Sequence, residues 1–345
     1  MKPGPCCVRR VIRLIESAGP NWLFEAGIGE DRAALVENGK IVEARIERHS
    51  GLRAGDIVGA RIVKKLSTGK RAITETNEGG HEVMLSSIPD GMTEGEALNI
   101  RITREAVNEK TRFKWPLAKA IDAEVSQAPS LVQAIGETGT SVQQCHAHEA
   151  DHFGDAGWHE VVEEARSGQV GFPGGSLLVA LTPAMTLIDV DGELPAMELA
   201  IAAADASARA IRRLALQGSI GIDFPAASEK ASRKKIADKF DAAMFGDFER
   251  TAVNGFGFMQ IVTRRVRPSL PELLQGKRMT GHALELLRLA ERSKPSGAVT
   301  LTAHPAIISK LEKREDWRSE LQKRTGREVT LQADPKLTMG GGYVS

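Results

Sequence analysis

Aromatic residues and cysteine are scarce in this 345-residue sequence. Aromatic residues make up 4% of the chain, so a broad surface for stacking nucleic-acid bases is not expected. Three cysteines, two of them adjacent at Cys6 and Cys7, are too few for a disulfide framework and favour a reducing cytoplasm. No stretch approaches the roughly 18 consecutive apolar residues of a membrane span. The first ten residues lack the apolar run and cleavage site of a secretion signal, so we expect a cytoplasmic protein.

An excess of one charge is also absent, since 46 Lys and Arg residues face 45 Asp and Glu residues. The length suits two or three compact units. Basic residues nevertheless cluster in three segments, 53–71, 101–114 and 264–267. Such clusters either follow a phosphate backbone or form solvated faces, and the pattern leaves both possibilities open. The candidates for phosphate contacts are Lys64, Lys65, Lys70, Arg71, Lys110, Arg112, Lys114, Arg264 and Arg265.

Two short apolar segments, 185–192 and 219–224, have the pattern of strands that end in acidic residues. Between them, residues 195–217 predict a helix, because a proline opens the segment, alanines fill its turns and Gly218 follows it. A strand, a helix and a second strand favour parallel pairing with a right-handed crossover. The sequence therefore predicts that the two strands lie side by side and end at the same edge of a sheet.

Three aspartates stand at that predicted edge. Asp189 and Asp191 are two residues apart and share one face of their strand, and Asp223 belongs to the neighbouring strand. Buried carboxylates this close repel each other unless a cation neutralises them. Three oxygen ligands with room for water suit Mg²⁺ or Mn²⁺, the ions of phosphodiester chemistry. The alternative is structural, because Asp-Gly is an ordinary turn pair and acids are common at strand ends.

The remaining patterns predict a mixed α/β chain with an inserted barrel. Residues 21–48 alternate like a hairpin around Asn38-Gly39, and residues 51–118 contain short, closely spaced strands typical of an OB-type barrel. Residues 122–145 are weakly patterned and suggest a connector, and two prolines in 264–275 suggest a boundary. Helices are expected at 156–167, 228–244, 281–293 and 306–325, and strands at 258–262, 298–302 and 328–332.

A second cluster of polar residues lies within fifteen positions, and cysteine and histidine are the ligands that zinc prefers. Its spacing fits no standard zinc pattern, so surface or packing roles are favoured. The cluster comprises Cys145, His146, His148, Asp151, His152 and His159.

Several segments resemble the ribonuclease E/G family. The resemblance covers nearly the whole chain, including the N-terminal hairpin, the barrel and the C-terminal piece. It is carried by Gly174–Val179, Thr186–Asp191, Ala202–Arg209, Ile220–Phe224, Phe256–Met259 and Arg264–Leu270.

The resemblance implies an endoribonuclease that hydrolyses single-stranded RNA with Mg²⁺, Mn²⁺ being possible, in RNA processing or decay. Asp189 and Asp223 would hold the metal, and Asp191 stands where the family commonly has asparagine. An RNase H-like subdomain, an S1-like barrel, a DNase I-like catalytic subdomain and a small C-terminal α/β domain are implied. Their expected boundaries are 1–49 with 119–172, then 50–118, 173–276 and 280–345.

The sequence departs from the family pattern in four places. No cysteine stands between 270 and 284, where a zinc-link is expected, and the 5′-end sensor is reduced to the segment 122–142. Ile73 and Val83 stand in place of aromatic residues that grip RNA, and Gly255 replaces an arginine. We therefore expect a monomer or weak homodimer that does not sense the 5′ end.

The expected chemistry is in-line attack of water on phosphorus, giving 5′-phosphate and 3′-hydroxyl ends. Arg264 or Arg265 is the candidate for holding the phosphate. A rival interpretation is a non-catalytic RNA-binding protein that keeps the fold. The three retained aspartates oppose it, because a site without turnover has no need of carboxylates that repel each other. DNA as the substrate is not excluded by the sequence.

Overall fold

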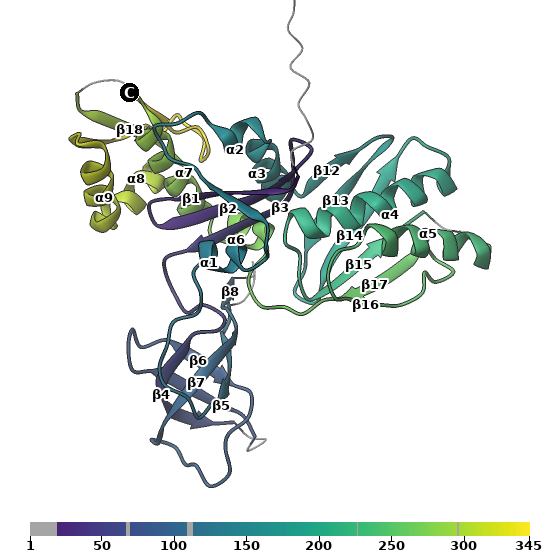
Figure 1. Ribbon diagram of the computed structural model, residues 1–345, viewed down its shortest axis with the longest axis horizontal. Coiled ribbons are helices and arrows are strands. Elements are labelled where there is room, and N and C mark those ends of the chain that lie inside the picture. Colours follow the sequence, from purple (N-terminus) through teal and green to yellow (C-terminus); the bar gives the residue numbers. More distant parts are fainter. Residues whose placement is uncertain (1–18, 67–69, 109–112, 226, 295–296) are drawn as a thin grey trace, which may run out of the picture.

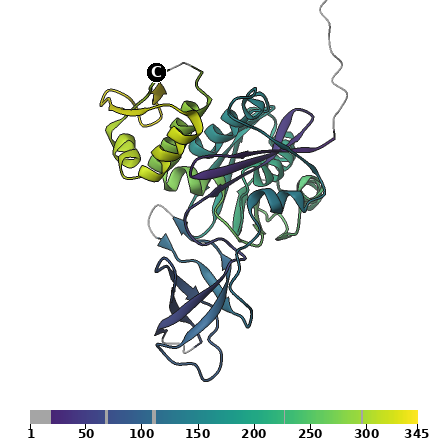
Figure 2. The same ribbon diagram turned by 60° about the vertical axis from the view of Figure 1, so that its left-hand side comes forward.

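The computed structural model describes residues 19–66, 70–108, 113–225, 227–294 and 297–345. Its strands form a four-stranded sheet, a closed barrel, a six-stranded sheet, a three-stranded sheet and a two-stranded ribbon. Figure 1 shows the barrel below the rest of the molecule, the six-stranded sheet to the right and the C-terminal unit to the left. The turned view in Figure 2 also shows the barrel projecting from the body. Within the described residues, no helix is both long and apolar enough to cross a membrane.

The N-terminal sheet begins with the expected hairpin. Asn38 and Gly39 form its turn with φ angles of 51° and 74°, as a tight two-residue hairpin turn requires. The segment expected to be a connector contains a capped helix and a strand that joins the sheet parallel to β1. The sheet order is β11-β1-β2-β3, from β1 (Asn21–Ala26), β2 (Glu30–Glu37), β3 (Lys40–Arg48) and β11 (Ser141–Gln144), with α1 (Leu131–Gly136), α2 (His152–Asp155) and α3 (Trp158–Ser167) around it.

The expected barrel forms as a closed sheet in the order β10-β6-β5-β4-β7. Its core is aliphatic, and Val83 is fully buried in it while Ile73 is half-buried. The Val83 side chain therefore does not face solvent or RNA in this barrel, and its correspondence to an RNA-gripping aromatic of the family stays a prediction. The strands are β4 (Ile57–Lys65), β5 (Ala72–Thr76), β6 (Glu82–Leu85), β7 (Ala97–Arg104) and β10 (Leu117–Ala120), with the ribbon β8 (Val107–Asn108) and β9 (Phe113–Lys114) beside them.

The six-stranded sheet follows in the order β12-β13-β14-β15-β17-β16, and α4 and α5 cover one of its faces (Figure 1). Because β12 pairs with β13, residues 169–172 belong to this sheet, and the expected boundary between 172 and 173 runs through the hairpin. The elements are β12 (Gln169–Phe172), β13 (Gly175–Leu181), β14 (Thr186–Gly192), α4 (Ala196–Arg213), β15 (Ser219–Asp223), α5 (Lys230–Ala243), β16 (Glu249–Arg250) and β17 (Phe258–Val262).

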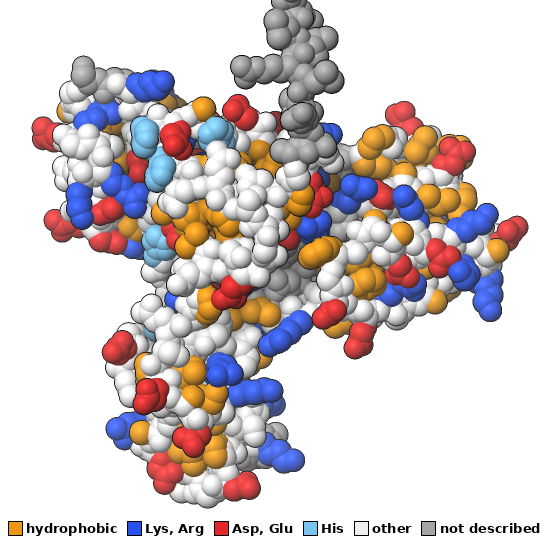
Figure 3. All heavy atoms as spheres, in the orientation of Figure 1, with side chains coloured by type: hydrophobic (Ala, Val, Ile, Leu, Met, Phe, Trp, Pro, Cys, Tyr) orange, Lys and Arg blue, Asp and Glu red, His pale blue; other side chains and the backbone are white. Residues whose placement is uncertain are grey.

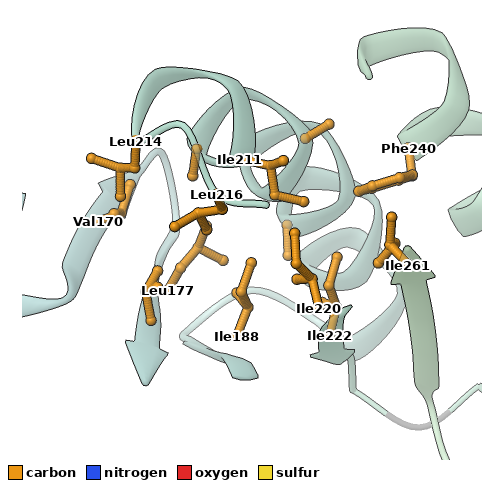
Figure 4. Close-up of a cluster of buried hydrophobic side chains, with 14 of the residues drawn as sticks. Val170, Leu177, Ile188, Ile211, Leu214, Leu216, Ile220, Ile222, Phe240 and Ile261 are labelled. Carbon is orange, nitrogen blue, oxygen red and sulfur yellow. The ribbon is translucent and has the colours of Figure 1, made fainter. Parts of the chain in front are cut away.

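Small residues let α4 pack closely against this sheet. They recur every three or four positions, the spacing of one helix face. Figure 4 shows Ile211 from α4 and Leu216 just after it above Ile188, Ile220 and Ile222 of the strands. The buried residues of the helix are Leu199, Ala200, Ala203, Ala204, Ser207, Ala208, Ala210 and Ile211.

The C-terminal unit is joined to the N-terminal sheet by buried ion pairs. Arg288 Nε donates to Glu25 Oε1 at 2.7 Å, and Ile28 packs into the C-terminal core. A helix that the sequence did not predict precedes the unit, and the predicted helix 306–325 is interrupted at residues 313–314. The elements are α6 (Leu270–Gly276), α7 (Arg278–Arg292), β18 (Val299–Ala303), α8 (Pro305–Glu312), α9 (Glu315–Thr325), β19 (Val329–Ala333) and β20 (Tyr343–Val344).

Candidate active site

Asp189 and Asp223 are direct neighbours in the six-stranded sheet. β14 and β15 are parallel, and the last matched pair in their register joins these two residues. Neighbouring strands lie about 4.8 Å apart, so the two carboxylates share a small volume at the carboxyl ends of the strands. The prediction that the two residues lie side by side is confirmed. The expectation that they are buried is wrong, because both are exposed.

Their exposure follows from the alternation of side chains along the strands. Ile188 and Ile222 are fully buried under the helices, whereas Leu187 and Asp189 face the side of the sheet without helices. The register places four residues in one row across this open face, because directly paired residues point the same way. The row is Leu178, Asp189, Asp223 and Phe258. The carboxylates thus stand between two apolar side chains at the edge of an open face.

Asp191 lies one pleat further along β14, opposite Ser176 of β13. Its Oδ1 accepts a hydrogen bond of 2.9 Å from the backbone N–H of Gly192. Across the described residues, no group of three His, Cys, Asp or Glu side chains is arranged to hold a metal ion. The structure therefore brings two of the three predicted aspartates into register, and it leaves Asp191 further along β14, beyond the last residue that pairs with β15.

The donor set of the pair fits a hard divalent cation. Among the residues that the structure describes, the side-chain oxygens of Asp189 and Asp223 have no hydrogen-bond or ion-pair partner, so the repulsion between the two carboxylates is not compensated. Mg²⁺ typically uses one or two carboxylates and keeps several waters, which an exposed pair leaves room for. The two aspartates could hold such an ion together with oxygens from water and a phosphate.

Arg264 and Arg265 lie at the opposite end of the sheet. β17 is antiparallel to β15, so Asp223 pairs with the first residue of β17, while Val262, which precedes the arginines, pairs with Ser219. Four residues of strand separate the two ends by about 13 Å. Arg265 is also engaged in an ion pair with Glu272. These arginines therefore do not lie beside the aspartates, and a contact of Arg264 or Arg265 with a phosphate of the RNA stays a prediction.

The other predicted phosphate contacts fall into separate groups. Lys64 and Lys65 end β4 and face the start of β5, near Lys70 and Arg71, and Figure 3 shows basic side chains along the right-hand flank of the barrel. Lys114 lines a pocket of about 140 Å³ together with Arg265 and Gln217. Lys110 and Arg112 lie outside the described residues.

Basic residues that were not among the predicted phosphate contacts begin the helix that follows the strand of Asp223. α5 begins just after the carboxyl end of β15, and its first turns carry Lys230, Arg233 and Lys234. Arg233 Nη1 donates to the carbonyl oxygens of Ala227 and Ser228 at 2.9 and 2.6 Å, which fixes the segment after Asp223. The sequence signal for these three residues was that several lysines and arginines follow a strand that ends in an aspartate.

The cysteine–histidine cluster does not form a metal centre within the described residues. Cys145 is buried, and burial raises the pKa of its thiol. The rings of His146 and His148 stack with their centroids 5.5 Å apart.

Comparison with known proteins identifies the family. The model of the ribonuclease E/G family matches residues 81–266, more than half of the chain, and the match includes both aspartate strands. This chain belongs to the ribonuclease E/G family. The parallel aspartate strands, the covering helices and part of the barrel are therefore family elements.

Curated members of the family are similar over a shorter length. Ribonuclease G of Escherichia coli (strain K12) is 25% identical over 189 residues, which cover 47% of this chain and 39% of that protein. Ribonuclease G of Shigella flexneri gives the same values, and that of Salmonella typhimurium (strain SL1344) is 24% identical over the same coverage. The chain thus matches about two fifths of the length of these relatives.

Proposed function

We propose that this protein is a divalent-metal-dependent endoribonuclease that hydrolyses single-stranded RNA in RNA processing or decay. The observation that carries the proposal is the register pairing of Asp189 with Asp223, whose carboxylates are exposed and have no hydrogen-bond or ion-pair partner among the described residues. Membership of the ribonuclease E/G family and the similarity to ribonuclease G support RNA as the substrate. We propose 5′-phosphate and 3′-hydroxyl products.

Each residue of the site has a distinct role in this proposal. Asp189 and Asp223 would hold Mg²⁺ or Mn²⁺, which supplies Lewis acidity toward the phosphodiester when it is bound. Asp191, one pleat away, would accept a hydrogen bond from the attacking water or join the ligands. Lys230 at the start of α5 would attract the phosphate backbone, since cations and a helix N-terminus both favour anions, whereas Lys234 is already paired with Asp238 at 2.7 Å.

The proposed subdomains follow the sheets of the structure. The four-stranded sheet with its helices would be the RNase H-like part, the closed barrel an S1-like RNA-binding part, the six-stranded sheet a DNase I-like catalytic part, and the three-stranded unit the small domain. We further propose a cytoplasmic enzyme. Because residues 270–284 contain no cysteine, we propose a monomer or weak homodimer without a shared zinc. With the sensor segment short, we propose no dependence on the 5′ end.

Cleavage of a labelled RNA tests the proposal. The purified protein is incubated with a 5′-labelled single-stranded RNA, with Mg²⁺ or with EDTA, and the ends of the products are mapped. Internal cuts with 3′-hydroxyl ends in Mg²⁺ and none in EDTA are expected. Binding without cleavage would instead support the non-catalytic RNA-binding alternative, and cleavage of single-stranded DNA at an equal rate would remove RNA as the specific substrate.

A further inference from the structure

Phe256 is the most exposed of the large hydrophobic side chains described, at 87%. It lies in the loop between β16 and β17, in a chain that contains few aromatic residues. Two other exposed phenylalanines differ from it. The Arg212 guanidinium lies 4.1 Å from the centroid of the Phe245 ring, and Phe113 borders residues that are not described. Among the described residues, the ring of Phe256 has no aromatic or cationic partner.

The loop places Phe256 close to the aspartate pair. Phe258, two residues later, pairs directly with Asp223 across the sheet. Two residues span at most about 7 Å, and neighbouring strands lie about 5 Å apart. The backbone of Phe256 is therefore within about 12 Å of that of Asp223. A phosphate held at the carboxylates would bring a neighbouring nucleotide within reach of the ring.

Hydrogen bonds hold this loop in a defined shape. Asn254 Oδ1 accepts from the backbone N–H of Phe256 at 2.9 Å and from that of Phe258 at 3.0 Å. The N–H of Gly257 donates to the carbonyl of Asn254 at 3.2 Å. The ring is thus presented on a braced turn, so ordering it on a ligand costs less entropy than ordering a free loop.

The same turn is fastened to the strand that carries Asp223. The N–H of Phe224 donates to the Gly257 carbonyl at 3.1 Å. Gly257 has a φ of +95°, and a Cβ there would lie 2.1 Å from the Phe224 carbonyl oxygen, so only glycine permits this contact.

We infer that Phe256 is a substrate-positioning residue whose ring stacks on one nucleobase beside the phosphate held at Asp189 and Asp223. The inference rests on the proposed function, because it takes RNA as the ligand. Every base has a π-face, so stacking tolerates any sequence. A base must leave its helix to offer that face, so the contact selects single-stranded RNA at the site of cleavage.

Binding to RNA that is not cut tests this inference separately from catalysis. In an Asp223→Asn background, Phe256→Ala should weaken the affinity for a short single-stranded RNA about tenfold in fluorescence anisotropy, within the range for one stacked base. Phe256→Trp should restore it. Phe245→Ala is the matched control, because its ring lies 4.1 Å from Arg212 at the end of α4, which leads into the start of β15, whereas Asp223 ends that strand; no change is expected. Thermal unfolding should be unchanged in Phe256→Ala, since the side chain is exposed.

An abasic scan locates the contact. Removing one base at a time from the RNA should reveal one position at which the loss of affinity equals the loss caused by Phe256→Ala. At that position, the abasic RNA and the Phe256→Ala variant together should bind no more weakly than either change alone predicts. Equal affinity of Phe256→Ala and its parent, or additive losses at every position, would overturn the inference. If the two affinity losses do not add but the wild-type protein cleaves no RNA, the proposed catalysis is refuted and the stacking contact remains. A protein that binds no RNA would refute both.

Discussion

The barrel and the six-stranded sheet use their residues in opposite ways. The barrel has a core of its own, made of small and branched aliphatic residues, and its basic side chains lie dispersed on the surface. The six-stranded sheet shares one continuous core with the N-terminal sheet, α3 and α6, and the two carboxylates that we propose as the metal site form one register pair in it. A dispersed charged surface suits affinity, whereas chemistry requires groups held in a rigid frame. We therefore expect substitutions in the two regions to separate binding from turnover.

The largest expected effect lies at the register pair. Asp189→Asn and Asp223→Asn should each lower turnover at least about a hundredfold, because removing a ligand charge removes several kcal/mol of transition-state stabilisation. RNA affinity should stay nearly unchanged, as measured by anisotropy beside single-turnover cleavage. Asp191→Asn should cost less and stay within about tenfold of wild type, because accepting a hydrogen bond from water needs an oxygen but not the negative charge that holding the metal needs. A wild-type rate for either of the first two variants would show that the site is misassigned.

The next effect should appear on the barrel. Reversing Lys64 and Lys65 to glutamate should weaken all RNA sequences alike, because phosphate contacts carry no sequence information. Single-strand affinity should fall with salt at a slope of about −0.7 per phosphate, or roughly −3 for four contacts, and the double reversal should flatten it. Reversal of the exposed Lys313 and Lys323 on the C-terminal unit changes the net charge equally and should leave the slope intact. A slope near zero for an active protein would place the RNA on another surface.

A smaller effect concerns the stability of the part of the protein outside the barrel, where α3 contacts α7. Burial of Glu285 opposes its ionisation, but His282 and the 2.7 Å ion pair with Arg166 outweigh burial and lower the pKa to about 2. A lowered pKa stabilises the fold above the ordinary value of 4.5, and this contribution is lost as the pH falls through about 2. Glu285→Gln should lower the free energy of unfolding by up to about 1 kcal/mol at neutral pH.

Urea unfolding at several pH values measures the difference in the free energy of unfolding between the wild-type protein and Glu285→Gln. This difference should shrink as the pH falls below 4.5. Glu160→Gln on the surface of α3 is the control and should change stability by less than about 0.5 kcal/mol. A difference that grows toward acid pH would contradict the assigned ion pair.

The smallest expected effect concerns the 5′ end of the RNA. Versions of one substrate with a 5′-monophosphate or a 5′-triphosphate should be cut at rates within about twofold, about 0.4 kcal/mol. A tenfold preference for the monophosphate, about 1.4 kcal/mol of differential binding, would show that the protein retains a 5′-end sensor.

The sequence predicted the aspartate unit well because local signals agreed there. Alternation, an alanine-rich helix with clear ends and the crossover rule together placed Asp189 beside Asp223. The same pattern did not show which face of the sheet the helices leave open, so the aspartates were expected to be buried. Which face of the sheet stays uncovered depends on packing between segments that are distant in the sequence.

The errors elsewhere have equally specific causes. The position of Arg264 depends on β17 being antiparallel to β15, and the local periodicity of a sequence does not reveal the order or direction of strands in a sheet. The helix α6 has a local sequence signal, a capping box formed by Ser269 and Glu272 around Pro271, and interpreting the prolines as a boundary overlooks it. The strand β11 is only four residues long and mostly polar, so only its pairing with β1 defines it.

The most direct test of the aspartate pair is metal binding without catalysis. Mn²⁺ titrated into the full chain and followed by electron paramagnetic resonance should show one site per chain, which Asp189→Asn and Asp223→Asn each abolish. Asp205→Asn should leave the site intact, because Arg209 at 2.6 Å and Lys239 at 3.1 Å already pair that carboxylate on α4. No bound Mn²⁺ in the wild-type protein, or equal binding by all four proteins, would contradict the assignment of Asp189 and Asp223 as the metal site.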